Sequence, residues 1–164
     1  MSRVAMFAWG NPSRGDDGVG PWFADRFRGR DGHGLFLVED FQLQVEHLLD
    51  CRQGDLLLFV DACSAPGDAL RFEEVSPTAS VAHTSHALTP AELLGYYPRL
   101  FPEVPPPAFQ VSIPGTQFEL GQSMSASTRA CCLRGAKLVE TLLRQPEIQH
   151  WRQLSQPQEE SCDA

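Results

Sequence analysis

Residues 3–20 read RVAMFAWGNPSRGDDGVG and contain the strongest indication of the fold class. Residues 3–9 form a nearly continuous apolar run, which is typical of a strand buried on both faces of a sheet. The turn that follows contains Asn11 and the adjacent aspartates Asp16 and Asp17. Apolar residues then recur at helical spacing from Val19 to Phe27. A buried strand, a glycine-rich turn and an amphipathic helix predict the opening of an α/β domain.

The alternation of strands and helices continues along the chain. Further strands are expected at residues 35–38, 56–62, 69–75 and 109–113, and the segment 69–75 is polar enough to lie at a sheet edge. Further helices are expected at about residues 44–51, 89–97 and 126–144. The second of these begins with the capping box Thr89-Pro90-Ala91-Glu92, and the proline-rich segment that follows is expected to be a loop.

These elements predict a three-layer α/β sandwich. Its five-stranded sheet is expected to be mostly parallel, or mixed, with helices on both faces. Residues 1–145 are expected to form a single domain, and the polar residues 146–164 a flexible C-terminal tail. In such folds, ligands bind beyond the carboxyl ends of the strands.

Composition narrows the classes of partner. The 164-residue chain carries a formal net charge of −8, which argues against a nucleic acid as the main partner. The apolar run near residue 4 is too short to span a membrane. The five cysteines are odd in number and lack C-x-x-C spacing, so they indicate free thiols in a reducing compartment. We therefore expect a cytoplasmic protein that acts without nucleic acid or membrane.

Polar residues at the expected strand ends form a candidate site. Asp16 and Asp17 follow the first strand, Asp61 ends the third, and His86 comes shortly before the Thr89 helix. Two carboxylates and an imidazole make a plausible incomplete shell for a divalent transition metal. Taken singly, Asp17 also fits a helix cap, Asp61 a strand-end turn and His86 an ordinary loop histidine. Spacing alone leaves these alternatives open.

Several other kinds of site are disfavoured. The glycine-rich turn lacks the Lys-Ser/Thr of a P-loop and the spacing of a dinucleotide-binding loop, so we expect no tightly bound organic cofactor. No serine lies in a G-x-S-x-G setting, which removes support for a serine hydrolase. The neighbours Cys131 and Cys132 would point apart on a helix and are not expected to form a redox pair.

Four blocks of the chain, taken together, resemble the [NiFe]-hydrogenase maturation endopeptidases. They are the opening strand with GNPSRGDDGVG, then LFVDAC, SHALTPAELL and SIPGTQFELGQSMS, in the order and spacing of that family from about residue 3 to residue 143. The first block, G-N-x-x-x-x-D-(D/E)-x-x-G, is fairly specific. The aspartate and histidine blocks are weak evidence when each is taken alone, but they support the resemblance because they occur in the family's order.

The resemblance implies an activity and a set of site residues. Family members remove a C-terminal extension from a hydrogenase large-subunit precursor after nickel insertion. The residues that sense nickel and support cleavage map by resemblance onto Asp17, Asp61 and His86, and Asp16 is left as a support or cap. The nickel would be supplied by the substrate, so the chain itself would carry little tightly bound metal.

One block departs from the family pattern. Many members carry an acidic residue followed by Gly-Gly-Thr after the second strand, whereas this chain reads VEDFQLQVEHLL. The branch that serves NAD-reducing cytoplasmic hydrogenases looks similar to this variant. Glu39, Asp40 and Gln42 would lie on the same rim as the nickel-sensing residues and are candidates for discriminating between clients.

Two other functions remain as alternatives. A peptidyl-tRNA hydrolase-like esterase also opens with a strand and a G-N-P turn, but it would need a histidine after that turn and a basic groove. A nickel-dependent chaperone would bind the hydrogenase precursor without shortening it.

Overall fold

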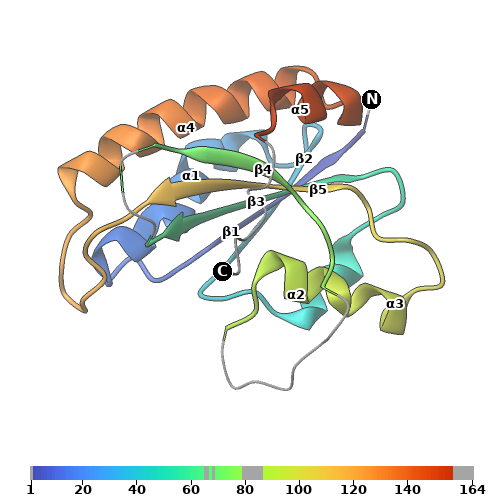
Figure 1. Ribbon diagram of the computed structural model, residues 1–164, viewed down its shortest axis with the longest axis horizontal. Helices are drawn as coiled ribbons and strands as arrows, with labels where there is room; N and C mark the ends of the chain where they lie inside the picture. The colour runs from blue at the N-terminus through green and yellow to red at the C-terminus, as the bar shows by residue number, and fades with distance from the viewer. Residues whose placement is uncertain (1, 65–66, 68, 79–86, 157–164) are drawn as a thin grey trace, which may run out of the picture.

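The computed structural model describes residues 2–64, 67, 69–78 and 87–156 of the chain. A single sheet organises them, with its five strands in the order β2-β1-β3-β5-β4 (Figure 1). Neighbouring strands are parallel except for β4, which runs antiparallel to β5 at one edge. The strands are β1 Val4–Trp9, β2 Leu35–Asp40, β3 Leu56–Cys63, β4 Arg71–Val75 and β5 Ala108–Pro114. The expected mixed, mostly parallel sheet with a polar edge strand is confirmed.

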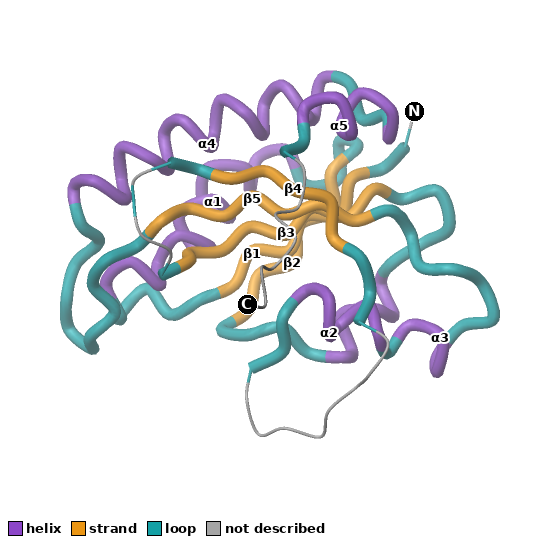
Figure 2. Tube along the Cα trace, viewed as in Figure 1, coloured by secondary structure: helices purple, strands orange, loops and turns teal. Residues whose placement is uncertain are grey.

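Helices cover both faces of this sheet, so the three-layer architecture is also confirmed (Figures 1 and 2). One face packs against α1 Val19–Phe27, α4 Ala126–Arg144 and α5 Ile148–Leu154. The other packs against α2 Pro90–Gly95, α3 Tyr97–Leu100 and the 3-10 helix η3 Val45–Asp50. Two further 3-10 turns, η1 Gly15–Gly18 and η2 Arg28–Arg30, flank α1.

The central strands are buried on both faces, as their apolar runs predict. In β1, Val4 and Met6 lie in the core beneath α1 and α4, whereas Ala5 and Phe7 lie in the core beneath α2 and α3. This division follows from the two-residue period of a strand, which sends successive side chains to opposite faces. The sheet therefore holds two separate apolar cores together.

Short elements differ from the sequence-based expectations. The helix expected at about residues 44–51 is a 3-10 helix over residues 45–50, in which Leu48 is buried and Leu49 is 64% exposed. The expected loop after Tyr97 begins instead with α3, because Pro98 occupies its first turn, where no backbone N–H is needed. In α4, Cys132, Ala136 and Val139 are buried, and near the end of the helix Leu142 is fully buried whereas Leu143 is only partly buried.

The expected flexible tail is wrong for the part of it that the structure describes. Residues 148–154 form α5, and Trp151 is fully buried against Phe72 and Phe109. The indole Nε1–H of Trp151 donates to the carbonyl oxygens of Leu142 and Gln145, each at 3.1 Å. The packed domain therefore continues past residue 145, while residues 157–164 lie outside the described residues.

The parallel strands end at one rim of the sheet, and the loops that carry the candidate residues leave from that rim. The β1–α1 connection contains η1, which contacts β3 near its end. Across the described parts of the chain, no helix combines the length and the apolar content needed to cross a lipid bilayer.

Candidate active site

The turn after β1 folds back on itself at Gly10. This residue has a φ of 144°, and a Cβ there would lie 2.0 Å from the carbonyl oxygen of Asp17. Only glycine tolerates that approach. The backbone N–H of Asn11 then donates to Asp17 Oδ2 at 2.7 Å, and Asn11 Oδ1 accepts from the N–H of Ser13 at 2.9 Å. Asn11 therefore shapes the turn, and its contact with Asp17 fixes that carboxylate at the rim.

Asp61 lies near the end of β3, where it pairs with Ser112 of β5. Its Oδ1 is buried and has no hydrogen-bond partner among the described residues. Burial raises the pKa of Asp61 to about 7, a backbone N–H of Ala62 opposes the shift, and the negative charge of Asp17 adds to it. An unsatisfied carboxylate oxygen in such a place costs free energy unless a proton or a cation meets it.

Asp16 has a different role from the helix cap that the sequence suggested. Its carboxylate is fully buried, and α1 has no side-chain cap. Asp16 Oδ2 accepts from the backbone N–H groups of Thr116 and Gln117 at 2.7 and 3.1 Å. Ser125 donates its N–H to Oδ1 at 2.7 Å and its hydroxyl to Oδ2 at 3.0 Å. Asp16 thus ties the β5–α4 loop to the β1–α1 turn.

Electrostatics agree with a permanently charged Asp16. Burial alone would raise the pKa of Asp16, but the hydrogen bonds from Thr116, Ser125 and Gln117 outweigh it, so the pKa falls below its usual value. The backbone strengthens the same junction, because the N–H of Asp16 donates to the carbonyl of Gln117 at 2.7 Å and that of Gly121 to Ser13 at 2.7 Å. The sequence did not reveal these partners, although the SIPGTQFELGQSMS block contains them.

The predicted third member of the site cannot be placed, because His86 lies outside the described residues. Thr89 accepts a hydrogen bond from the N–H of Glu92 and caps α2, as the capping box predicts. Within residues 2–64, 67, 69–78 and 87–156, no group of three His, Cys, Asp or Glu side chains could hold a metal ion. Asp17 and Asp61 are therefore a pair of acids to which His86 remains a predicted addition.

The residues expected to discriminate between clients lie at the end of β2. Glu39 Oε2 pairs with Arg28 Nη2 at 2.8 Å. Asp40 Oδ2 lies 3.2 Å from His47 Nε2, and Asp40 Oδ1 accepts from the N–H of Phe41 at 2.7 Å. Gln42 is exposed.

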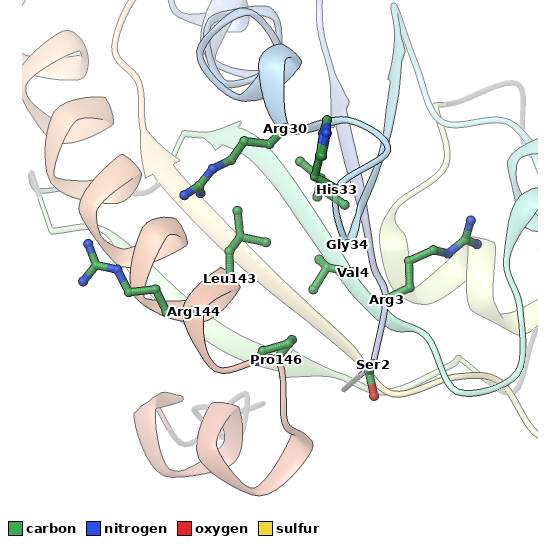
Figure 3. Close-up of a pocket in the computed structure, with 10 residues that line it drawn as sticks. Ser2, Arg3, Val4, Arg30, His33, Gly34, Leu143, Arg144 and Pro146 are labelled. Carbon is green, nitrogen blue, oxygen red and sulfur yellow. The ribbon is translucent and has the colours of Figure 1, made fainter.

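A cavity of about 500 Å³ lies elsewhere, at the amino-terminal ends of β1 and β2 (Figure 3). Its basic residues include Arg30, which pairs with Glu140 at 2.7 Å, and Arg3, which pairs with Asp55 at 2.8 Å. Asp17 follows the opposite end of β1 and Asp61 lies near that same end of β3, so this cavity is separate from the candidate site.

Comparison with solved structures decides the fold family. No protein-family profile and no curated protein sequence matches the chain. A [NiFe] hydrogenase maturation protease, HycI from Thermococcus kodakarensis, superposes with a TM-score of 0.65 at 21% identity, covering 87% of this chain and 93% of its own. The chain has the fold of the [NiFe]-hydrogenase maturation proteases.

Two further structures with this maturation-protease fold come from other organisms. The hydrogenase maturating endopeptidase HybD from E. coli has a TM-score of 0.66 at 17% identity, covering 88% of this chain and 93% of its own. A hydrogenase 2 maturation peptidase from a Thaumarchaeota archaeon has a TM-score of 0.62 at 17% identity, covering 87% and 99%. At these identities the likeness establishes the fold, and the chemistry has to come from the residues of the site.

Proposed function

We propose that this protein is an endopeptidase that removes the C-terminal extension of a [NiFe]-hydrogenase large-subunit precursor after nickel insertion. The observation that carries the proposal is the buried Oδ1 of Asp61, which has no hydrogen-bond partner among the described residues. Burial raises the pKa of this carboxyl group, and the negative charge of Asp17 raises it further. A fold shared with maturation proteases supports it, and so do the four sequence blocks.

We expect the precursor to bring the nickel to the site as part of the substrate. Two nearby carboxylates repel each other, and a divalent cation between them removes that repulsion. Asp17 and Asp61 would supply oxygen ligands to the nickel of a loaded precursor, and His86 an imidazole nitrogen. An unloaded precursor brings no cation, so Asp61 would keep its proton and the complex would lose that contribution to binding.

This arrangement supplies selectivity for a finished client. Discrimination grows when the wrong partner leaves buried polar groups unsatisfied. Here the group left unsatisfied would be the Asp61 carboxylate. Asp16 would contribute indirectly, because it holds the β5–α4 loop beside the turn that presents Asp17. We expect the reaction to take place in the cytoplasm, where the precursor would be assembled.

The experiment compares variants on one nickel-loaded precursor, purified from the organism that encodes this chain after deletion of its gene. Mass spectrometry reports whether the precursor is shortened. Asp17→Asn, Asp61→Asn and His86→Ala are expected to lose at least 100-fold in rate, of the order found when one essential interaction is removed. Glu147→Gln is the matched control, because Glu147 is an exposed acid near Ser2 and Arg3, at the opposite end of β1 from the site. Binding without shortening by the unmodified protein would favour the chaperone alternative.

A further inference from the structure

One edge of the sheet, as far as the structure describes it, is open near the candidate site. β2 is an edge strand that pairs only with β1 among the described strands. At one end of this pairing the N–H of Val4 donates to the carbonyl oxygen of Gly34, and at the other end the N–H of Gly10 donates to that of Asp40. In a parallel pair alternate residues bond to the neighbour, so the intervening Leu35, Leu37 and Glu39 turn their backbone groups outward.

The first half of this outer edge is already satisfied by the chain itself. Leu35 O accepts from the N–H of Gly32 at 2.9 Å, and the N–H of Leu37 donates to Asp31 Oδ1 at 3.0 Å. The second half differs, because the backbone N–H and C=O of Glu39 have no hydrogen-bond partner in the part of the chain that the structure describes.

The opposite edge of the sheet is closed in a comparable way. Phe72 of β4 exchanges hydrogen bonds with Gln156, from Phe72 N–H to the side-chain Oε1 at 2.9 Å and from Gln156 N–H to Phe72 O at 2.7 Å. Proteins commonly cover or interrupt edge strands in this manner, since free edges attract other strands. A free half-edge beside a candidate site is therefore a notable exception.

The open half-edge leads directly into a pocket. A cavity of about 320 Å³ lies at the end of β2 and is lined by Gly10, Pro12, Pro21, Glu39, Asp40 and Phe41. Phe41 is 68% exposed, and the prolines add further apolar surface. Gly10 also packs against Asp17, so the pocket is continuous with the candidate site.

We propose that an extended segment of the client precursor adds to β2 as a further strand at Glu39 and places an apolar side chain in the Pro12–Pro21–Phe41 pocket. This inference rests on the proposed function. Addition of a strand gives affinity through the main chain, and a neighbouring pocket gives specificity. The carboxylates of Glu39 and Asp40 line the pocket and would repel an acidic residue in that segment.

Sheet geometry sets the distance between this contact and the reaction. An added strand would lie three strand spacings from β3, which carries Asp61, or roughly 14 Å at about 4.8 Å per spacing. An extended peptide covers about 3.3 Å per residue, so the paired segment should lie about four residues from the scissile bond. Charge argues against a second copy of this chain as the occupant, because antiparallel pairing centred on Glu39 would oppose Glu39 to itself.

The test compares Glu39→Pro with Glu39→Gln. Both substitutions remove the Glu39 carboxylate and its pair with Arg28, but only proline also removes the backbone N–H, which bonds to nothing in the described part of the sheet. With nickel-loaded precursor, we expect Glu39→Pro to raise KM at least 10-fold with kcat little changed, and Phe41→Ala to raise it similarly. Glu39→Gln measures the effect of the lost charge by itself, and its KM should stay at least 5-fold below that of Glu39→Pro. Equal KM values for Glu39→Pro and Glu39→Gln would overturn the inference.

A complementary measurement works even if Glu39→Pro does not fold. Proline is placed in turn at successive positions of the precursor segment, and strand addition predicts that KM rises at alternate positions about four residues from the cleaved bond. A uniform response, or a wild-type dimer that Glu39→Pro dissociates, would contradict it. If the wild-type protein does not shorten the unaltered precursor, the proposed function itself fails. If the wild-type protein shortens the precursor but none of these substitutions changes KM, the strand addition is wrong and the proposed function stands.

Discussion

Asp16 and Ser125 are joined by two hydrogen bonds across 109 residues of sequence, at 2.7 Å from the backbone N–H and 3.0 Å from the hydroxyl. Ser125 is also the N-cap of α4, so the same contact starts the longest helix of the domain. The neighbouring carboxylate of Asp17 faces the site instead, where it accepts from Asn11. Adjacent acids therefore have separate tasks, one in the loop junction and one at the rim.

Replacing Asp16 should weaken this junction. In Asp16→Asn the amide group would confront N–H donors, and we expect the free energy of unfolding to fall by about 2–4 kcal/mol. Urea unfolding measures the change. Asp25→Asn is the control, because the exposed pair of Asp25 and Arg28 is worth at most about 1 kcal/mol. Equal stabilities for the two variants would show that the junction contributes little.

The raised pKa of Asp61 predicts a pH dependence of stability. Its folded value of about 7 exceeds the unfolded value of about 3.9, so the folded state holds the extra proton between them. Protonation of Asp61 stabilises the folded state fully below about pH 4, and this stabilisation is lost as pH rises through 7. The total loss is up to about 4 kcal/mol of unfolding free energy. Asp61→Asn removes this loss, so the variant should gain stability over the wild type as pH rises. Urea unfolding of the metal-free proteins at pH 4.5 and 8 measures this, and parallel pH profiles would contradict it.

The turn at Gly10 should not accept a side chain. In Gly10→Ala the new Cβ would lie 2.0 Å from the Asp17 carbonyl oxygen, in a backbone conformation with φ of 144°. We expect a loss of more than about 2 kcal/mol in unfolding free energy, together with loss of processing. Gly29→Ala is the matched control, since no heavy atom lies within 4 Å of its added Cβ. A fully active Gly10→Ala would contradict the described turn.

The terminal helix should contribute to stability. Trp151→Ala removes a fully buried side chain that contacts Phe72 and Phe109, at an expected cost of about 3–5 kcal/mol. Leu154→Ala serves as the control, because Leu154 is 40% exposed. Thermal unfolding followed by circular dichroism compares them. A Trp151→Ala melting temperature equal to that of the control would restore the expectation of a loose tail.

Strong local patterns explain what the sequence could predict. The buried runs of β1 and β3, and the spacing from Val19 to Phe27, lie within single elements, so periodicity reveals them. The bounds of α4 agree because Ser125 marks its start. The short α5 was missed, since its one buried tryptophan shows no period. The helix expected at about residues 44–51 is present as η3, which has too few turns for its buried side to be predicted.

The candidate site was only partly accessible to such reasoning. The order of strands and loops indicated Asp17 and Asp61, because parallel strands end at one rim. The partners of Asp16 could not be predicted, since contacts between residues 16 and 125 depend on tertiary packing. The open edge at Glu39 depends on which neighbour β2 has, which no local pattern contains.

We expect cleavage by Asp17 and Asp61 to require nickel in the client precursor. The most direct measurement is the intact mass of the large-subunit precursor after incubation with the purified wild-type protein, once with nickel-loaded and once with nickel-free precursor. We expect the loaded precursor to lose its C-terminal extension and the nickel-free precursor to keep an unchanged mass. Equal shortening of both, or of the loaded precursor by Asp61→Asn at the wild-type rate, would contradict it.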